Sequence, residues 1–177
     1  DGLISIDFKT RMDEDSLPTT WWDQKEYASA NYGAAQMKDR FGTNPFDYPK
    51  ALGLVRDCLL ACNVSESSTV LDFFAGSGTT AEAVLGLNRS DNGKRRFVLV
   101  EMGRHYHTVV KPRTAKAIYS PDWKDGRAQS HDKGVSALVK YFALESYEDA
   151  LNNLPTPTGV LLAGVDAAAQ DALITYS

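Results

Sequence analysis

Residues 69–80, Thr-Val-Leu-Asp-Phe-Phe-Ala-Gly-Ser-Gly-Thr-Thr, decide how this chain folds. Thr69–Phe73 is a short apolar run that ends abruptly in small residues, which predicts a buried parallel strand. Ala75–Gly78 predicts a tight turn. Thr79–Leu87 has the apolar spacing of one helix face at Ala81, Val84, Leu85 and, less strictly, Leu87. A strand, a glycine-rich turn and a helix in this order build nucleotide sites at the carboxyl edge of α/β sheets.

The turn has the features of a ligand-binding loop. Gly76 and Gly78 let the backbone approach a ligand closely, and the N–H groups that open the helix favour an anion. A loop for a nucleoside triphosphate needs a lysine after the last glycine, where this chain has Thr79. A dinucleotide fingerprint is met by Gly76, Gly78 and Ala81, although this pattern alone is a weak signal.

Two acidic residues favour a third ligand, S-adenosylmethionine. The carboxylate of Asp72, at the end of the first strand, suits the ammonium group of such a ligand better than a pyrophosphate. Arg96–Val100 predicts a second parallel strand, and Glu101 follows it directly. A carboxylate about 20 residues after the glycines, at the tip of the next strand, is where a ribose diol is held. A plain turn without a ligand is the alternative interpretation.

Leu71–Thr80 resembles the cofactor motif of DNA amino-methyltransferases, whose usual form is D-P-F-A-G-S-G-T-T, with Phe73 at the proline position. Further segments are similar to the adenine-N6 modification subunit of type III restriction-modification systems. These are Pro18–Trp22, Phe46–Lys50, Arg95–Glu101 and Leu144–Leu154. The resemblance covers residues 17–154, and its combined motifs are far more specific than any single one.

The resemblance implies an α/β fold of the Rossmann-like, S-adenosylmethionine-dependent methyltransferase type, with a partial, mostly parallel sheet and flanking helices. It implies that this chain is the cofactor-binding part of a site-specific DNA adenine-N6 methyltransferase. Its partners would be DNA, the remaining half of the enzyme or a second copy of the chain, and a restriction subunit. The residues expected to bind S-adenosyl-L-methionine are Asp47, Tyr48, Lys50, Asp72, Phe73, Phe74, Ala75, Gly76, Ser77, Gly78, Thr79, Thr80, Glu101 and Met102.

Three regions are expected along the chain. Residues 1–44 would be a linker or tail of a target-recognition region, 45–154 the cofactor-binding domain, and 155–177 a helical extension. Within the central region we predict a helix over 51–62, with one apolar face toward the core, and a second helix over 104–118. Residues 124–134 are predicted to be a loop, and residues 135–144 have the composition of a third parallel strand.

We assign no catalytic residue. Methyltransferases of this kind hold the target amine with Asp, Asn or Ser, two prolines and an aromatic residue, which stacks on the flipped base. Ser120–Trp123 and Asn44–Phe46 are each one proline short, and none of the seven prolines is adjacent to another. We therefore expect a fragment that binds cofactor but methylates little alone. The alternatives are a non-catalytic assembly module that needs a partner chain and a fragment of an NAD-binding oxidoreductase.

The composition, 43% hydrophobic and 24% charged, is typical of an α/β domain. No apolar run is long enough for a membrane span, and we expect no signal peptide. Cys58 and Cys62 are predicted to be reduced core thiols of a cytoplasmic protein, and no metal site is expected. His105 and His107 are two residues apart, which makes a poor metal pair, so we expect solvated or capping side chains there. The net charge is −4, but residues 88–127 carry ten Lys/Arg and four acids. This stretch is either a surface that steers DNA phosphates or a solvated face.

Overall fold

The structure is a computed structural model that describes residues 22–153. It contains two compact units, one that extends to Ala137 and one that starts at Leu138, and each is described by itself. The predicted extension at 155–177 lies outside the described residues, as do residues 1–21 of the expected linker.

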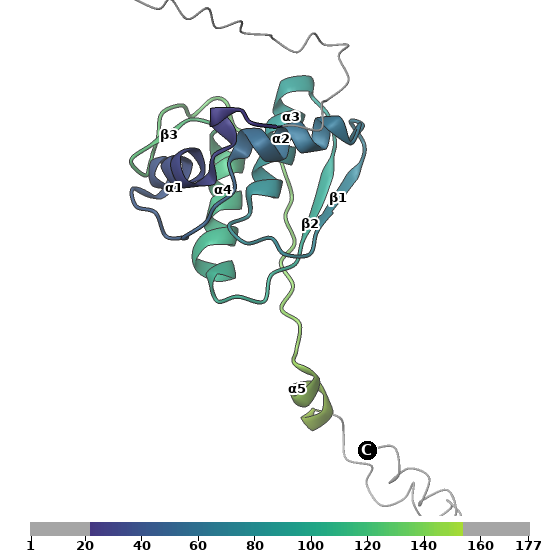
Figure 1. The fold of residues 1–177 in the computed structure, drawn as a ribbon. Helices are drawn as coiled ribbons and strands as arrows, with labels where there is room; N and C mark the ends of the chain where they lie inside the picture. Colours follow the sequence, from purple (N-terminus) through teal and green to yellow (C-terminus); the bar gives the residue numbers. More distant parts are fainter. Residues whose placement is uncertain (1–21, 154–177) are drawn as a thin grey trace, which may run out of the picture. The chain divides into compact units, whose positions relative to one another are not determined.

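The first unit combines helices with two short, two-stranded sheets (Figure 1). In chain order its elements are a 3₁₀ turn (Lys25–Tyr27), a π-helical turn (Ser29–Gly33), α1 (Ala34–Phe41), α2 (Leu52–Ala61), β1 (Thr69–Asp72), α3 (Thr79–Asp91), β2 (Arg96–Leu99), a π-helical turn (Tyr106–Val110), α4 (Lys111–Tyr119), β3 (Trp123–Lys124) and β4 (Arg127–Ala128). The second unit contains α5 (Tyr147–Asn152).

β1 and β2 pair in parallel, as predicted, with Asp72 opposite Leu99. The pairing continues past the strands, because the Val100 N–H donates to the Asp72 carbonyl at 2.9 Å. The Ala75 N–H then donates to the Val100 carbonyl at 3.1 Å. The turn after β1 is therefore fastened to the end of β2, which brings the tips of both strands together.

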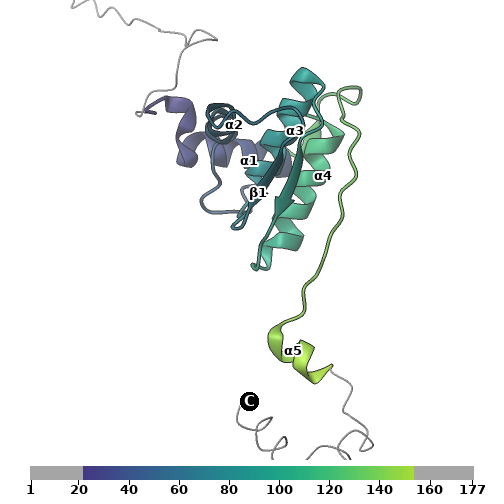
Figure 2. The same cartoon turned by 90° about the vertical axis from the view of Figure 1, so that its right-hand side faces the viewer.

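α3 supplies much of the core and packs against both α2 and α4 (Figure 2). The four apolar positions predicted for its inner face, Ala81, Val84, Leu85 and Leu87, are all buried. The prediction of this helix is confirmed, although it extends to Asp91. None of the helices in the described part of the chain is both long and apolar enough to cross a membrane.

The expectation of a buried sheet is wrong for one face. Leu71 is 52% exposed and Val98 is 48% exposed, while Val70 and Phe97, which point the other way, are partly buried. Side chains of a strand alternate between the two faces of the sheet, and among the described residues only one of these faces is covered. Phe73 and Val100 continue the uncovered apolar face.

Three other expectations are corrected. Residues 135–144 form no strand: a strand needs a neighbouring backbone, and Leu138, Phe142 and Leu144 are largely exposed. Cys58 and Cys62 are free thiols but are exposed, so they are not part of the core. α2, whose apolar face was predicted to be core, has no fully buried side chain.

A short hairpin within the predicted loop at 124–134 was missed. β3 and β4 pair antiparallel through Asp125 and Gly126, which both have positive φ angles of 47° and 79°. An Asp-Gly pair is the usual signal of such a turn, so the sequence did contain the information.

Gly33 allows a close approach that positions the segment before α2. A β-carbon at Gly33 would overlap the Pro49 carbonyl oxygen and lie 2.9 Å from the Pro49 carbonyl carbon. Gly86, in the middle of α3, has nothing within 4 Å of the same position.

We therefore predict opposite effects for two identical substitutions. Gly33→Ala should lower the free energy of unfolding by about 1–3 kcal/mol because the backbone of Pro49 must move. Gly86→Ala should raise it by about 0.5–1 kcal/mol because alanine is the better helix former. Urea denaturation measures both values, and equal stabilities of the two variants would contradict the close approach of Gly33 to Pro49.

Candidate functional site

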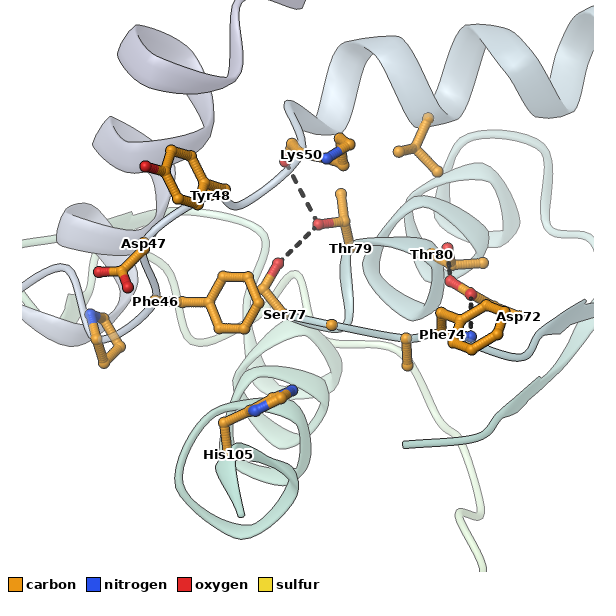
Figure 3. A pocket seen from close by; sticks show the side chains of 14 residues that line it. Phe46, Asp47, Tyr48, Lys50, Asp72, Phe74, Ser77, Thr79, Thr80 and His105 are labelled. Atoms are coloured by element: carbon orange, nitrogen blue, oxygen red, sulfur yellow. Dashed lines mark hydrogen bonds between the residues drawn. The ribbon is translucent and has the colours of Figure 1, made fainter. Parts of the chain in front are cut away.

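A cavity of about 600 Å³ lies between the glycine turn after β1 and the segment before α2 (Figure 3). Its walls come mainly from two segments that the sequence analysis identified, the glycine turn and Phe46–Lys50, and from the loop after β2. The lining residues are Pro45, Phe46, Asp47, Tyr48, Lys50, Val55, Asp72, Phe74, Ala75, Gly76, Ser77, Thr79, Thr80 and His105.

The glycine turn has a backbone that only glycine adopts readily. Gly76 and Gly78 have φ angles of 54° and 79°, in the left-handed region. At Gly78 a β-carbon would also lie 3.3 Å from the Val110 side chain. Gly78 is the N-cap of α3, and in the described part of the chain no side chain caps this end. The first N–H groups of α3 therefore remain free of capping, as an anion site requires.

Asp72 is fixed at the start of the turn. Its Oδ2 accepts a hydrogen bond from the Thr80 hydroxyl at 2.6 Å, and its Oδ1 accepts one from the Phe74 N–H at 3.1 Å. The carboxylate thus connects the tip of β1 to the first turn of α3. It lines the cavity with two oxygens that can each accept a further hydrogen bond.

Glu101 holds the same turn from the neighbouring strand. Its Oε2 accepts the Gly76 N–H at 2.8 Å, and its Oε1 accepts the Gly103 N–H at 2.7 Å. His105 Nε2 lies 3.2 Å from Oε2. Burial acts to raise the pKa of the Glu101 carboxyl. The hydrogen bonds from Gly103 and Gly76, with a smaller contribution from His105, outweigh burial and lower this pKa below its ordinary value.

A buried ionic cluster lies behind the turn. Glu82, in the first turn of α3, accepts hydrogen bonds from Arg113 Nε at 2.8 Å and from Arg40 Nη2. Arg113 is fully buried and Arg40 nearly so. Burial lowers the pKa of Arg113 to about 10, which still leaves the guanidinium protonated at neutral pH. The sequence offered no signal for this cluster beyond a basic stretch.

Ten of the fourteen predicted site residues line the cavity. The other four, Phe73, Gly78, Glu101 and Met102, do not line it. Glu101 nevertheless contacts the turn by accepting the Gly76 N–H, and Gly78 is the last residue of the turn. Phe73 is 62% exposed and Met102 is 97% exposed, so neither side chain is enclosed. Four lining residues were absent from the predicted set: Pro45, Phe46, Val55 and His105.

His105 was expected to be a solvated or capping side chain, and the structure corrects this. It lies in the cavity wall beside Glu101, with its ring edge-on to Phe46 at a centroid distance of 5.1 Å. Its position four residues after Glu101 was an available signal. Ser120–Trp123, which lacks one proline of the catalytic motif, does not line the cavity. Ser120 is the C-cap of α4, and the Trp123 indole N–H donates to the Ser120 carbonyl at 2.8 Å.

Comparison with known proteins identifies the family. A family model described as DNA methylase (N6_N4_Mtase) matches residues 6–112. The chain is 41% identical over 97 residues to the type III restriction-modification enzyme StyLTI Mod subunit of Salmonella typhimurium, which covers 53% of this chain. It is 36% identical over 120 residues to the type II methyltransferase M.KpnI of Klebsiella pneumoniae, which covers 68% of this chain.

These relatives are much longer than the region they share with this chain. The match covers 14% of the Salmonella protein and 26% of the Klebsiella protein. A third relative, the EcoPI Mod subunit of Escherichia phage P1, is 40% identical over 84 residues, 13% of its length. The resemblance to modification subunits is thereby confirmed. Since the family model matches more than half of the 177 residues, the chain belongs to the DNA methylase family.

Proposed function

We propose that the cavity binds S-adenosylmethionine. The observation that carries this proposal is the position of two carboxylates, Asp72 and Glu101, on either side of a left-handed glycine turn that opens an uncapped helix. The cavity volume of about 600 Å³ lies within the range of about 300–1,000 Å³ that is usual for small-ligand sites. The match to DNA methylases supports this ligand and gives no support to the NAD-binding alternative.

The proposed ligand and the site have complementary charges. The amino end of α3 would face its carboxylate, since free N–H groups and the helix dipole both favour an anion. Asp72 would hold its ammonium group, with Lys50 near the same end, and Glu101 would accept hydrogen bonds from the ribose. When bound, S-adenosylmethionine supplies an activated methyl group for transfer to adenine N6.

We further propose that this chain is the cofactor-binding part of an adenine-specific modification enzyme of a type III restriction-modification system. The uncovered apolar face of β1 and β2 supports a role beside further structure. Leu71, Phe73, Val98 and Val100 would be covered by the remaining half of the enzyme or by a second copy of the chain. DNA and a restriction subunit are the other proposed partners.

The basic stretch at 88–127 gives DNA binding less support than its charge suggested. Arg95 and Arg113 are buried, and they form ion pairs with the exposed Asp91 and the buried Glu82, respectively. Arg89 donates to two backbone carbonyls. Part of the positive charge is therefore used in contacts within the unit. The remaining exposed basic residues would contact DNA phosphates, and they include Lys94, Arg96, Arg104, Lys124 and Arg127.

The binding proposal predicts a clear ligand preference. By isothermal titration calorimetry the chain should bind S-adenosylmethionine and should not bind NAD. Asp72→Asn and Glu101→Gln should each weaken binding about 10- to 100-fold, because each loses a charge-assisted contact. Glu66→Gln removes the charge of an exposed glutamate that does not line the cavity and should bind as the unchanged chain does. Tighter binding of NAD would overturn the proposal.

A second prediction concerns the reaction. The chain by itself should transfer no methyl group to DNA, because it contains no Pro-Pro motif to hold the target amine. Radiolabelled methyl transfer to adenine-containing duplex DNA measures this, with an intact type III modification enzyme as the positive control. Methylation above background by a preparation of this chain alone would refute the assignment as a cofactor-binding part.

A further inference from the structure

One buried side chain connects the walls of the cavity without lining it. Arg113 Nη1 donates to the Ser77 hydroxyl and the Thr79 hydroxyl, both at 2.8 Å, and lies 3.3 Å from the Ser77 carbonyl. The Thr79 hydroxyl donates in turn to the Lys50 carbonyl at 3.3 Å (Figure 3). A single guanidinium nitrogen on α4 therefore contacts the turn and the start of α3 directly, and the segment before α2 through one hydroxyl.

The remaining bonds of Arg113 fix where this nitrogen lies. Its Nε donates to Glu82 at 2.8 Å, so the side chain is held at two points in a fully buried position. A guanidinium is planar and rigid, so anchoring Nε determines the direction in which Nη1 points. Glu82 is shared with Arg40, which leaves two buried cations for one carboxylate close to the amino end of α3.

We propose that Arg113 is a positioning residue that sets the conformation of the glycine turn for its ligand. This inference rests on the proposed cofactor site and deepens it. Positive φ angles at Gly76 and Gly78 are accessible to glycine but not enforced by it, because glycine populates many conformations. Two hydroxyl contacts from a rigid buried donor select one of them before the ligand arrives, which lowers the entropic cost of binding.

The competing explanation is that Arg113 is only a structural partner of Glu82. Arg40 provides a matched control, since it is also buried and also donates to Glu82. Arg40 Nη2 also lies 3.4 Å from the Pro121 carbonyl, which is not part of the turn. Arg113→Met and Arg40→Met therefore each remove one of the two cations that neutralise Glu82, but only Arg113→Met removes donors to Ser77 and Thr79.

The test compares the two variants of the 177-residue chain at a temperature where circular dichroism shows both folded. Both should lower the melting temperature. Only Arg113→Met should weaken S-adenosylmethionine binding, about tenfold, with Arg40→Met within about threefold of the unchanged chain. In ¹H–¹⁵N spectra recorded without ligand, the amides of Gly76 and Gly78 should shift in Arg113→Met and keep their positions in Arg40→Met.

If Arg113→Met does not fold, the variant Thr79→Val tests the positioning role of Arg113 in its place. It retains the Arg113–Glu82 pair and removes one acceptor, so it should weaken binding and shift the same amides. Equal effects of Arg113→Met and Arg40→Met, or unchanged binding and amide positions in Thr79→Val, would overturn the positioning role. If the unchanged chain binds no S-adenosylmethionine, the cofactor proposal fails, while the ligand-free amide shifts still decide the role of Arg113.

Discussion

The left-handed backbone at Gly76 and Gly78 is the constraint on which the rest of this structure depends. It reverses the chain between the tip of β1 and the first turn of α3, so that a strand end and a helix start lie at one place. Once the chain turns there, Asp72 reaches Thr80 and Glu101 reaches the Gly76 N–H. Both carboxylates thus stabilise the turn, and Asp72 also lines the cavity, which links the fold directly to the site.

The β1–β2 sheet has one face that is covered by helices and one face that is exposed in the described part of the chain. α3 buries its apolar face completely, and the buried cluster of Arg113, Glu82 and Arg40 connects it to α4 and α1. The opposite face of the sheet leaves Leu71 and Val98 about half exposed. The chain matches only 14% of the length of the Salmonella relative and 26% of that of the Klebsiella relative.

Sequence reasoning succeeded where a pattern is local. The strand, the glycines and the helical spacing up to Leu87 are encoded within about twenty residues, and a carboxylate at the next strand tip follows from parallel pairing.

Sequence reasoning failed where the structure depends on partners that are distant in the chain. The Arg113–Glu82 contact spans 31 residues, and a basic stretch is no sign of a buried arginine. Residues 135–144 have strand composition, but a strand also requires a free neighbouring edge. His105 and the Asp125-Gly126 turn carried local signals that were available and were not used.

The most direct measurement of the central claim is a titration of the ¹⁵N-labelled chain with S-adenosylmethionine, followed through backbone amide shifts. If the glycine turn is the cofactor site, the perturbed amides should cluster at Gly76–Thr80 and at Glu101–Gly103. The amides of the hairpin at 123–128 should stay in place. Saturable shifts that leave the turn unperturbed, or the absence of any shift at millimolar ligand, would contradict the assignment of the cofactor site.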